Sequence, residues 1–281
     1  MPAINLSLPL TLLEIRKFRK TIYSYYKEHG RELPWRQTQD PYHILVSEIM
    51  LQQTQVERVV EKYPTFVRQF QSFRVLADAP LRDVLAAWQG LGYNRRAASL
   101  KKISEIVTTK HGGNFEADLE FLTGLPGIGH NTACAVLAYA FNKPFGFIET
   151  NIRTVFIHFF FPDRDGIRDS EILPLVEQTL DRKNPRAWYS ALMDYGTMLK
   201  KTHGSTNPRS AHYQKQSAFK GSDRQVRGMI LKTIITHSRI TDAQIMKELQ
   251  LPAERALKAL TALQKEGFVR EIEGQYAISG E

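Results

Sequence analysis

The chain has 281 residues, enough for one large domain or for a medium domain followed by a small one, and its 42% hydrophobic content supports a folded core. Lys and Arg number 38 against 29 Asp and Glu, which gives a formal net charge of +9. This charge is typical of a protein that binds a polyanion, but a solvated basic surface would also account for it. The single cysteine, Cys134, excludes an intrachain disulfide, a four-cysteine zinc site and a cysteine-ligated iron–sulfur cluster.

The cellular location is predicted from the same composition. One cysteine indicates a reducing compartment. No apolar run approaches the roughly 20 residues that a membrane span needs, and residues 1–13 lack the charged start and cleavage site of a signal peptide. We therefore expect a cytoplasmic protein without membrane partners.

Helical periodicity dominates the first 200 residues, and strand patterns are scarce there. Short connections with Gly and Pro separate the helical runs, as in compact helical domains. The pattern predicts an all-α body. Apolar residues recur every three or four positions in five runs: 12–26, 44–70, 81–87, 97–111 and 132–140.

Residues 200–223 are predicted to form an irregular connection, because polar residues, Gly and Pro replace the apolar pattern. We therefore expect one domain over 1–220 and a small domain over 221–281. The second begins with a helix over 225–237, Thr241 caps a second helix, and Pro252 opens a third. Strands over 268–272 and 276–278 then form a hairpin.

Three helices and a hairpin are the order of a winged helix, which commonly binds DNA. The alternative is a small helical module for protein contacts. In a winged helix the third helix usually enters the DNA groove, and basic residues lie in or just after it here. The residues expected to contact DNA are Lys258, Lys265 and Arg270.

The segment from Leu125 to Ala133 contains two glycines in a turn between helices. Gly127 and Gly129 let backbone amides approach a phosphate, and the next helix adds the partial positive charge of its N-terminus. A plain helix-to-helix turn is the alternative. If the turn holds a DNA backbone, the contacting residues are Leu125, Gly127, Gly129 and Thr132.

This hairpin resembles the helix-hairpin-helix of the HhH-GPD DNA glycosylase superfamily. Motifs at 33–36, 40–42, 47–56 and 90–93 also resemble, in order and spacing, those of adenine-specific mismatch glycosylases, the MutY-like enzymes. The resemblance covers residues 33–196. It implies two helical subdomains and a monomeric, nucleoid-associated base excision repair enzyme. Its partner would be double-stranded DNA with a mismatched or damaged base.

The resemblance also implies the catalytic residues. Glu48 matches the glutamate that protonates adenine, and burial in an apolar run would raise its pKa. Glu149 stands where the family places its catalytic aspartate, one methylene longer, and Asn151 matches the asparagine that follows. A solvated structural Glu48 and a non-catalytic Glu149 before a helix are the alternatives. Breaking an N-glycosidic bond needs an acid at the base and a carboxylate near the sugar.

Asn131 occupies the position that holds Lys in glycosylases with lyase activity. Without an amine there is no Schiff base, so we expect a monofunctional hydrolase, with Lys143 as the rival amine. By resemblance, Gln52 or Gln53 fills the gap left by the flipped base, and Tyr93 lies near the opposite base. Capping or bridging of helices is the alternative role for either glutamine.

Two departures from the family concern cofactor and substrate. Residues 200–219 contain no cysteine, so we expect a variant without the iron–sulfur cluster, with a monovalent cation at the hairpin backbone as the one ion to consider. About 60 residues after Asp223 are too few for the usual reader of oxidised guanine. The predicted target is adenine opposite guanine or oxidised guanine. The alternatives are thymine or uracil excision, or a catalytically degenerate DNA-binding protein.

Overall fold

The computed structural model describes residues 9–215 and 218–280. The first eight residues, part of the segment assessed for a signal peptide, lie outside the described residues. Residues 216 and 217 of the expected irregular connection also lie outside them. Within the described ranges the chain is mostly helical and its sheet has two strands, which confirms the all-α class. In that part of the chain no helix is both long and apolar enough to cross a membrane.

The chain divides into two compact units, and each unit combines segments that are distant in sequence. The first unit contains residues 1–48 and 116–215, and the second contains 49–115 and 216–281. The predicted domain division at residue 220 stays a prediction, because a compact unit need not be a functional domain.

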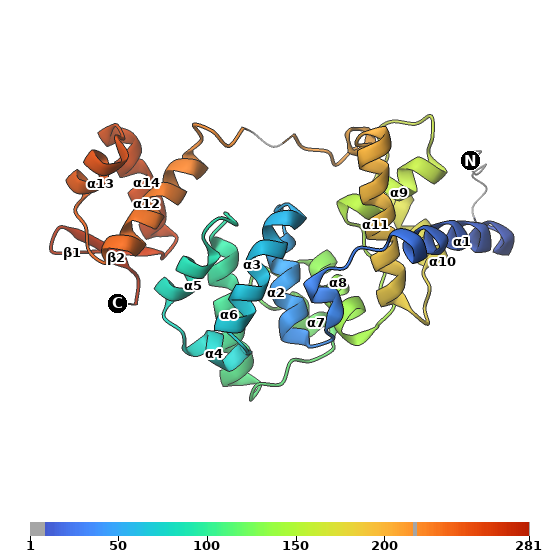
Figure 1. The fold of residues 1–281 in the computed structure, drawn as a ribbon, viewed down its shortest axis with the longest axis horizontal. Coiled ribbons are helices and arrows are strands. Elements are labelled where there is room, and N and C mark those ends of the chain that lie inside the picture. The colour runs from blue at the N-terminus through green and yellow to red at the C-terminus, as the bar shows by residue number, and fades with distance from the viewer. Residues whose placement is uncertain (1–8, 216–217, 281) are drawn as a thin grey trace. The chain divides into compact units, whose positions relative to one another are not determined.

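The first unit is a cluster of helices around an aromatic core. The Phe18 ring on α1 lies 5.1–5.8 Å from four rings of α9 and α11, and α1 also contacts α10 (Figure 1). This burial removes a large apolar area from water. The elements are α1 (Leu12–His29), η1 (Pro34–Gln37), α2 (Pro41–Leu51), α7 (Leu119–Thr123), α8 (His130–Phe141), α9 (Thr150–Phe160), α10 (Asp169–Thr179), α11 (Pro185–His203) and η2 (Asn207–Arg209).

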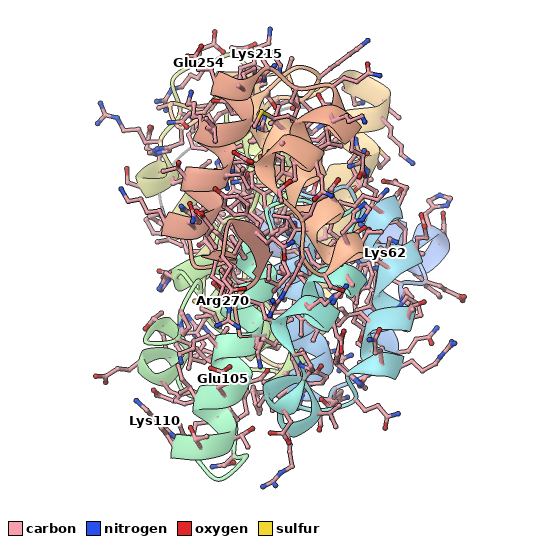
Figure 2. All side chains as sticks on the ribbon, turned by 90° about the vertical axis from the view of Figure 1, so that its left-hand side faces the viewer. Lys62, Glu105, Lys110, Lys215, Glu254 and Arg270 are labelled. Carbon is pink, nitrogen blue, oxygen red and sulfur yellow. The ribbon has the colours of Figure 1, made fainter. Side chains whose placement is uncertain are left out.

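The second unit has its own core, in which Phe66 and Trp88 meet edge to face at 5.7 Å. Charged side chains such as Glu105 and Lys110 project from α6 (Figure 2). The helix α2 runs from the first unit into the second at Ile49. The elements of this unit are α3 (Val56–Gln69), α4 (Phe73–Asp78), α5 (Leu81–Trp88), α6 (Arg95–Lys110), α12 (Asp223–His237), α13 (Asp242–Leu249), α14 (Ala253–Lys265), β1 (Val269–Ile272) and β2 (Gln275–Ile278).

The helical run expected over 44–70 is divided, since α2 ends at Leu51 and α3 begins at Val56. Gln53 between them has φ +55°, a left-handed conformation that interrupts helical hydrogen bonding. The expected irregular connection also begins later than residue 200. The helix α11 continues to its last residue, His203, and the C-cap Gly204 has a φ of +77° that suits glycine. Apolar periodicity alone marks neither change.

Residues 223–278 contain the three helices and the hairpin in the expected order. Thr241 and Gln244 form a capping box at the start of α13, and Pro252 precedes α14. The strands pair antiparallel, with Val269 opposite Ile278. Glu273 and Gly274 both have positive φ in the two-residue turn, as a type I′ hairpin requires. The identification of this module as a winged helix stays a prediction.

Candidate active site

Glu48 lies on α2 and only 8% of its surface is exposed, which excludes a solvated structural role. Loss of water raises the pKa of its carboxyl well above the usual range, and the negative charge of Glu149 raises it further. The positive charge of Arg36 acts in the opposite direction. Glu48 is therefore the group in this cluster best suited to hold a proton and donate it.

Glu149 occupies the N-cap position of α9 in an extended conformation, but its side chain does not cap the helix. The carboxylate therefore remains available for another partner. Burial raises its pKa, whereas the ammonium of Lys200 on α11 lowers it. Glu149 thus has a nearby cation to stabilise its charged form, in contrast to the more deeply buried Glu48.

The two carboxyls belong to one electrostatic cluster. The charges of Glu48 and Glu149 both raise the pKa of Tyr139, after loss of water around its hydroxyl. Two interacting carboxyls do not ionise together readily, so their pKa values move apart. The arrangement favours a protonated Glu48 beside an ionised Glu149, a pair that can act as an acid and an anionic carboxylate.

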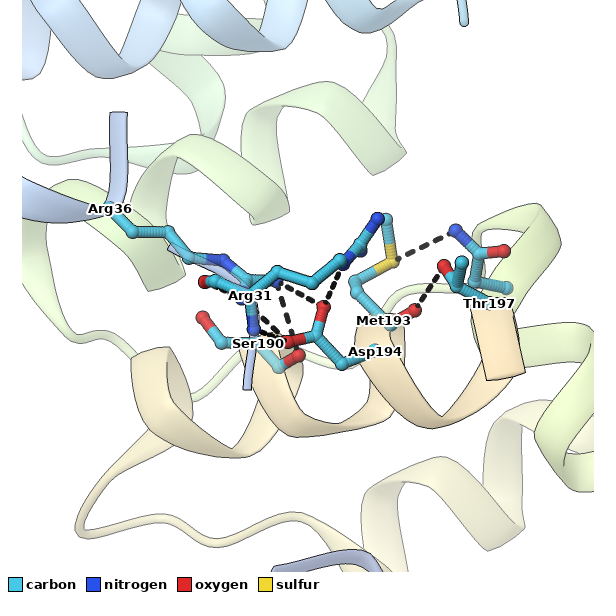
Figure 3. Close-up of polar contacts among 7 residues, drawn as sticks. Arg31, Arg36, Ser190, Met193, Asp194 and Thr197 are labelled. Carbon is cyan, nitrogen blue, oxygen red and sulfur yellow. Dashed lines mark hydrogen bonds and ion pairs between the residues drawn. The ribbon is translucent and has the colours of Figure 1, made fainter. Parts of the chain in front are cut away.

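Arg36 is held by a buried ion pair that the sequence pattern did not predict (Figure 3). Its two terminal nitrogens lie 2.8 Å from the two carboxylate oxygens of Asp194, and Arg31 Nε lies 2.6 Å from the Oδ1 atom. The Asp194 side chain is 1% exposed. The bidentate pairing fixes Arg36 near the carboxyl cluster and lowers the pKa of Asp194. Asp194 therefore positions the charge that acts on Glu48.

We expect D194N to lower the free energy of unfolding by about 3 kcal/mol, because it leaves two arginines without their buried anion. Urea denaturation at pH 7 measures this. Since the pKa of Asp194 is depressed, its contribution is present above the unfolded pKa and is lost as pH falls through the folded value. D163N, at an exposed position, is the control. Equal stability of the two variants would contradict the role of Asp194.

The hairpin between α7 and α8 has the backbone that close approach to a phosphate requires. Gly127 has φ +80°, and the Ile128 amide donates to the Leu125 carbonyl at 3.2 Å, which closes the turn. Leu125 and Ile128 are buried and anchor it. Gly129 is the N-cap of α8 and has no side chain to cover the first-turn amides, which include that of Thr132.

Asn131 connects α8 to the segment before Glu149, and the Asn151 side chain lies between α9 and α11. The Asn131 amide on α8 donates to the carbonyl of Ile148, the residue before Glu149, at 2.9 Å. The Asn151 amide on α9 lies 3.8 Å from the Met193 sulfur on α11. Gly196 lets α11 approach α9, because a Cβ there would lie 2.4 Å from the Asn151 carbonyl oxygen. Lys143 is exposed and donates to the Ala117 carbonyl.

The second unit holds Gln52, Gln53 and Tyr93, and a buried arginine that sequence reasoning missed joins their turns. One terminal nitrogen of Arg96 donates to the carbonyls of residues 49, 50 and 52 at 2.5–2.8 Å. The other donates to the carbonyls of residues 91 and 92 at 3.1–3.2 Å. Tyr93 and Gln53 both have positive φ, so Arg96 stabilises two unusual turns at once.

We expect R96A to lower the free energy of unfolding by about 3 kcal/mol, because several buried carbonyls lose their donor. Burial lowers the pKa of Arg96 to about 10, so it stays charged at pH 7. R96K should cost nearly as much, since an ammonium lacks the fork that reaches both turns. Urea denaturation of both variants tests this, and a wild-type midpoint for R96K would contradict it.

Comparisons with known proteins identify the fold and the family. The solved structure of a thermostable thymine-DNA glycosylase superposes with a TM-score of 0.60 at 24% identity, and covers 69% of this chain and 91% of that chain. Residues 46–185 match the family described as HhH-GPD superfamily base excision DNA repair protein. The chain belongs to this superfamily, as its motifs predicted.

Three curated relatives cover different shares of the chain. An adenine DNA glycosylase of Mycobacterium tuberculosis (strain CDC 1551 / Oshkosh) is 30% identical over 92% of this chain and 93% of its own. An adenine DNA glycosylase of Buchnera aphidicola subsp. Baizongia pistaciae is 35% identical over 65% of this chain. This chain spans about half the length of that relative, 52%. A thymine/uracil-DNA glycosylase of Pyrobaculum aerophilum is 35% identical over 60% of this chain and 72% of its own.

Proposed function

We propose that the protein is a monofunctional DNA glycosylase that hydrolyses the N-glycosidic bond of adenine mispaired with guanine or oxidised guanine in double-stranded DNA. The observation that carries this proposal is the buried Glu48, whose pKa is raised beside the second carboxyl, Glu149. Family membership and the Mycobacterium tuberculosis relative, which matches along nearly its whole length, support adenine as the target.

In the proposed reaction Glu48 donates its proton to a ring nitrogen of the flipped adenine. The bond between the sugar C1′ and the base breaks, and its electron pair leaves with the base. Ionised Glu149 stabilises the positive charge on the sugar. Water then adds to C1′ and transfers its proton to Glu149. No amine takes part, because Asn131 stands where a lyase has Lys and its amide is bonded to the Ile148 carbonyl.

DNA binding is assigned to three parts of the chain. The hairpin residues Leu125, Gly127, Gly129 and Thr132 hold the phosphate backbone. Gln52 or Gln53 fills the space of the flipped base, and Tyr93 lies near the opposite base. Residues 221–281 form a winged-helix domain after a glycosylase domain of 1–220. We propose that the protein acts as a monomer at the nucleoid.

The residues present do not fit an iron–sulfur cluster. The chain has one cysteine, Cys134, which is buried in the core of the first unit on α8. Four thiolates are needed. Among the described residues no group of His, Cys, Asp and Glu could hold a metal ion. We propose an enzyme without the cluster, with a monovalent cation at the hairpin backbone as the one ion that could bind there.

The direct test is a panel of duplexes with A opposite oxidised G, A opposite G, T opposite G and U opposite G. After incubation, alkali breaks the strand at any site that has lost its base. We expect breaks in the two adenine duplexes. Binding without breaks in any duplex would show a degenerate DNA-binding protein. Borohydride trapping of a covalent product would contradict the monofunctional assignment.

Thymine or uracil excision is the second candidate function. The observation that favours it is the Pyrobaculum aerophilum relative, which is 35% identical over 60% of this chain. Glu48 favours adenine as the target instead, because protonation of a purine ring makes the base a better leaving group. Breaks only in the T and U duplexes of the same panel would establish this alternative.

A further inference from the structure

Within the second unit, α3, α5, the turn at residues 90–94 and α12 line a groove of about 920 Å³. This volume lies within the usual range of ligand-binding pockets. Five cationic side chains line it, and no Asp or Glu does in the described part of the chain. They are Arg58, Lys62, Arg224, Arg227 and Lys232.

The groove also contains exposed aromatic rings. Phe219 is 61% exposed and Tyr93 is 37% exposed. Arg224 donates to the Tyr93 hydroxyl at 2.5 Å, and its guanidinium carbon lies 5.6 Å from the centre of that ring. Arg96 stands 5.7 Å from the same centre. Two cations from different segments of the chain thus lie within cation–π distance of Tyr93.

The lining combines the two features that bind nucleic acid strands, cations for the phosphates and an exposed ring, Phe219, for a base. We propose that this groove is a DNA-binding site in which α12 contacts phosphates of the strand that runs past Gln53 and Tyr93, with Phe219 against a base. The inference rests on the proposed function only in taking DNA as the ligand. It extends the DNA contact proposed for Gln52 or Gln53 to the C-terminal helix α12.

The charges favour α12 over the predicted contact helix α14. Lys258 on α14 lies 3.0 Å from Asp223, and Arg255 lies 3.6 Å from the same residue, so this anion offsets part of their charge. Lys232 on α12 is exposed and faces the groove. Among the groove cations, Arg227 contributes less, because it lies 2.9 Å from Glu266.

The experiment measures the affinity of the full chain for a fluorescein-labelled 20-base-pair duplex at several salt concentrations. K62A and K232A test the two walls of the groove, and K258A tests α14. Lys110 is the matched control, because it is exposed and lies well away from Lys62 at the end of α6 (Figure 2). Thermal melting checks that these variants and F219A fold.

We expect K62A and K232A each to raise Kd roughly threefold to tenfold and to reduce the salt slope by about one, as the loss of one phosphate contact does. K110A should keep the wild-type slope. F219A should weaken binding at least about fivefold without a change in slope, because stacking is not ionic. A wild-type slope in both K62A and K232A, or a reduced slope in K258A alone, would overturn the proposal.

Binding and base release are measured separately, so the two proposals fail separately. Reduced slopes in K62A and K232A, without strand breaks in the duplex panel, would support the groove and refute the glycosylase. Breaks at adenine with unchanged slopes would refute the groove and leave the proposed function intact.

Discussion

E48Q is expected to lower the single-turnover rate constant for adenine release by about 10²- to 10⁴-fold, the usual contribution of a positioned acid. The amide keeps the size of the side chain in its buried position but has no acidic proton. Quench and alkali treatment of an A opposite G duplex with excess enzyme measures the rate constant. E28Q, at an exposed position on α1, is the matched control and should keep the wild-type rate.

The pH dependence follows from the same raised pKa. Activity that needs protonated Glu48 should fall as pH rises through this pKa, and E48Q should lose that limb of the profile. The free energy of unfolding changes in the same direction. A raised folded pKa contributes stability below the unfolded value, about 4.3, and loses it as pH rises through the folded one. E48Q should therefore be less sensitive than wild type to rising pH.

A wild-type excision rate in E48Q would remove Glu48 from the mechanism. If E48Q kept the wild-type rate at low pH and still lost activity as pH rises, a group other than Glu48 would be responsible for that loss. Tyr139 is one such titratable group, because the charges of both carboxyls act on its hydroxyl. The pH profile of Y139F would then identify the group that titrates.

Local features of the chain were predictable from sequence. Gly127 and Gly129 mark a turn by their conformational freedom, and Thr241 marks a helix start by its capping oxygen. Glu48 could be placed in a buried helix, because apolar residues surround it in sequence. Each of these inferences depends on neighbours within about one helical turn, where spacing fixes proximity.

Long-range polar contacts were not predictable. Asp194 is 158 residues from Arg36, and Arg96 is 44 residues from the carbonyl of Gln52. An arginine that donates to backbone carbonyls leaves no sign in sequence, because every residue type carries that acceptor. The groove is a further case, since its cations lie on segments separated by more than 150 residues and only folding brings them together.

E149Q should lower the single-turnover rate constant for adenine release by about 10²- to 10³-fold, because it removes the negative charge that stabilises the cationic sugar. E149D is the sharper test of the departure from the family aspartate. The shorter side chain keeps the charge but moves it roughly 1 Å, and such a shift can cost about a hundredfold in rate. We therefore expect E149D to lie between wild type and E149Q.

The rates of E149Q, E149D and K200M together identify what Glu149 does. Lys200 lowers the pKa of Glu149, so K200M should raise it and reduce the charged fraction at neutral pH. If the charge is what matters, the rate of K200M falls and recovers as pH rises, whereas E149Q stays slow at every pH. Full activity of E149Q would exclude Glu149 from catalysis. A rate above wild type in E149D would show that the extra methylene impairs the site, as in a partly degenerate enzyme.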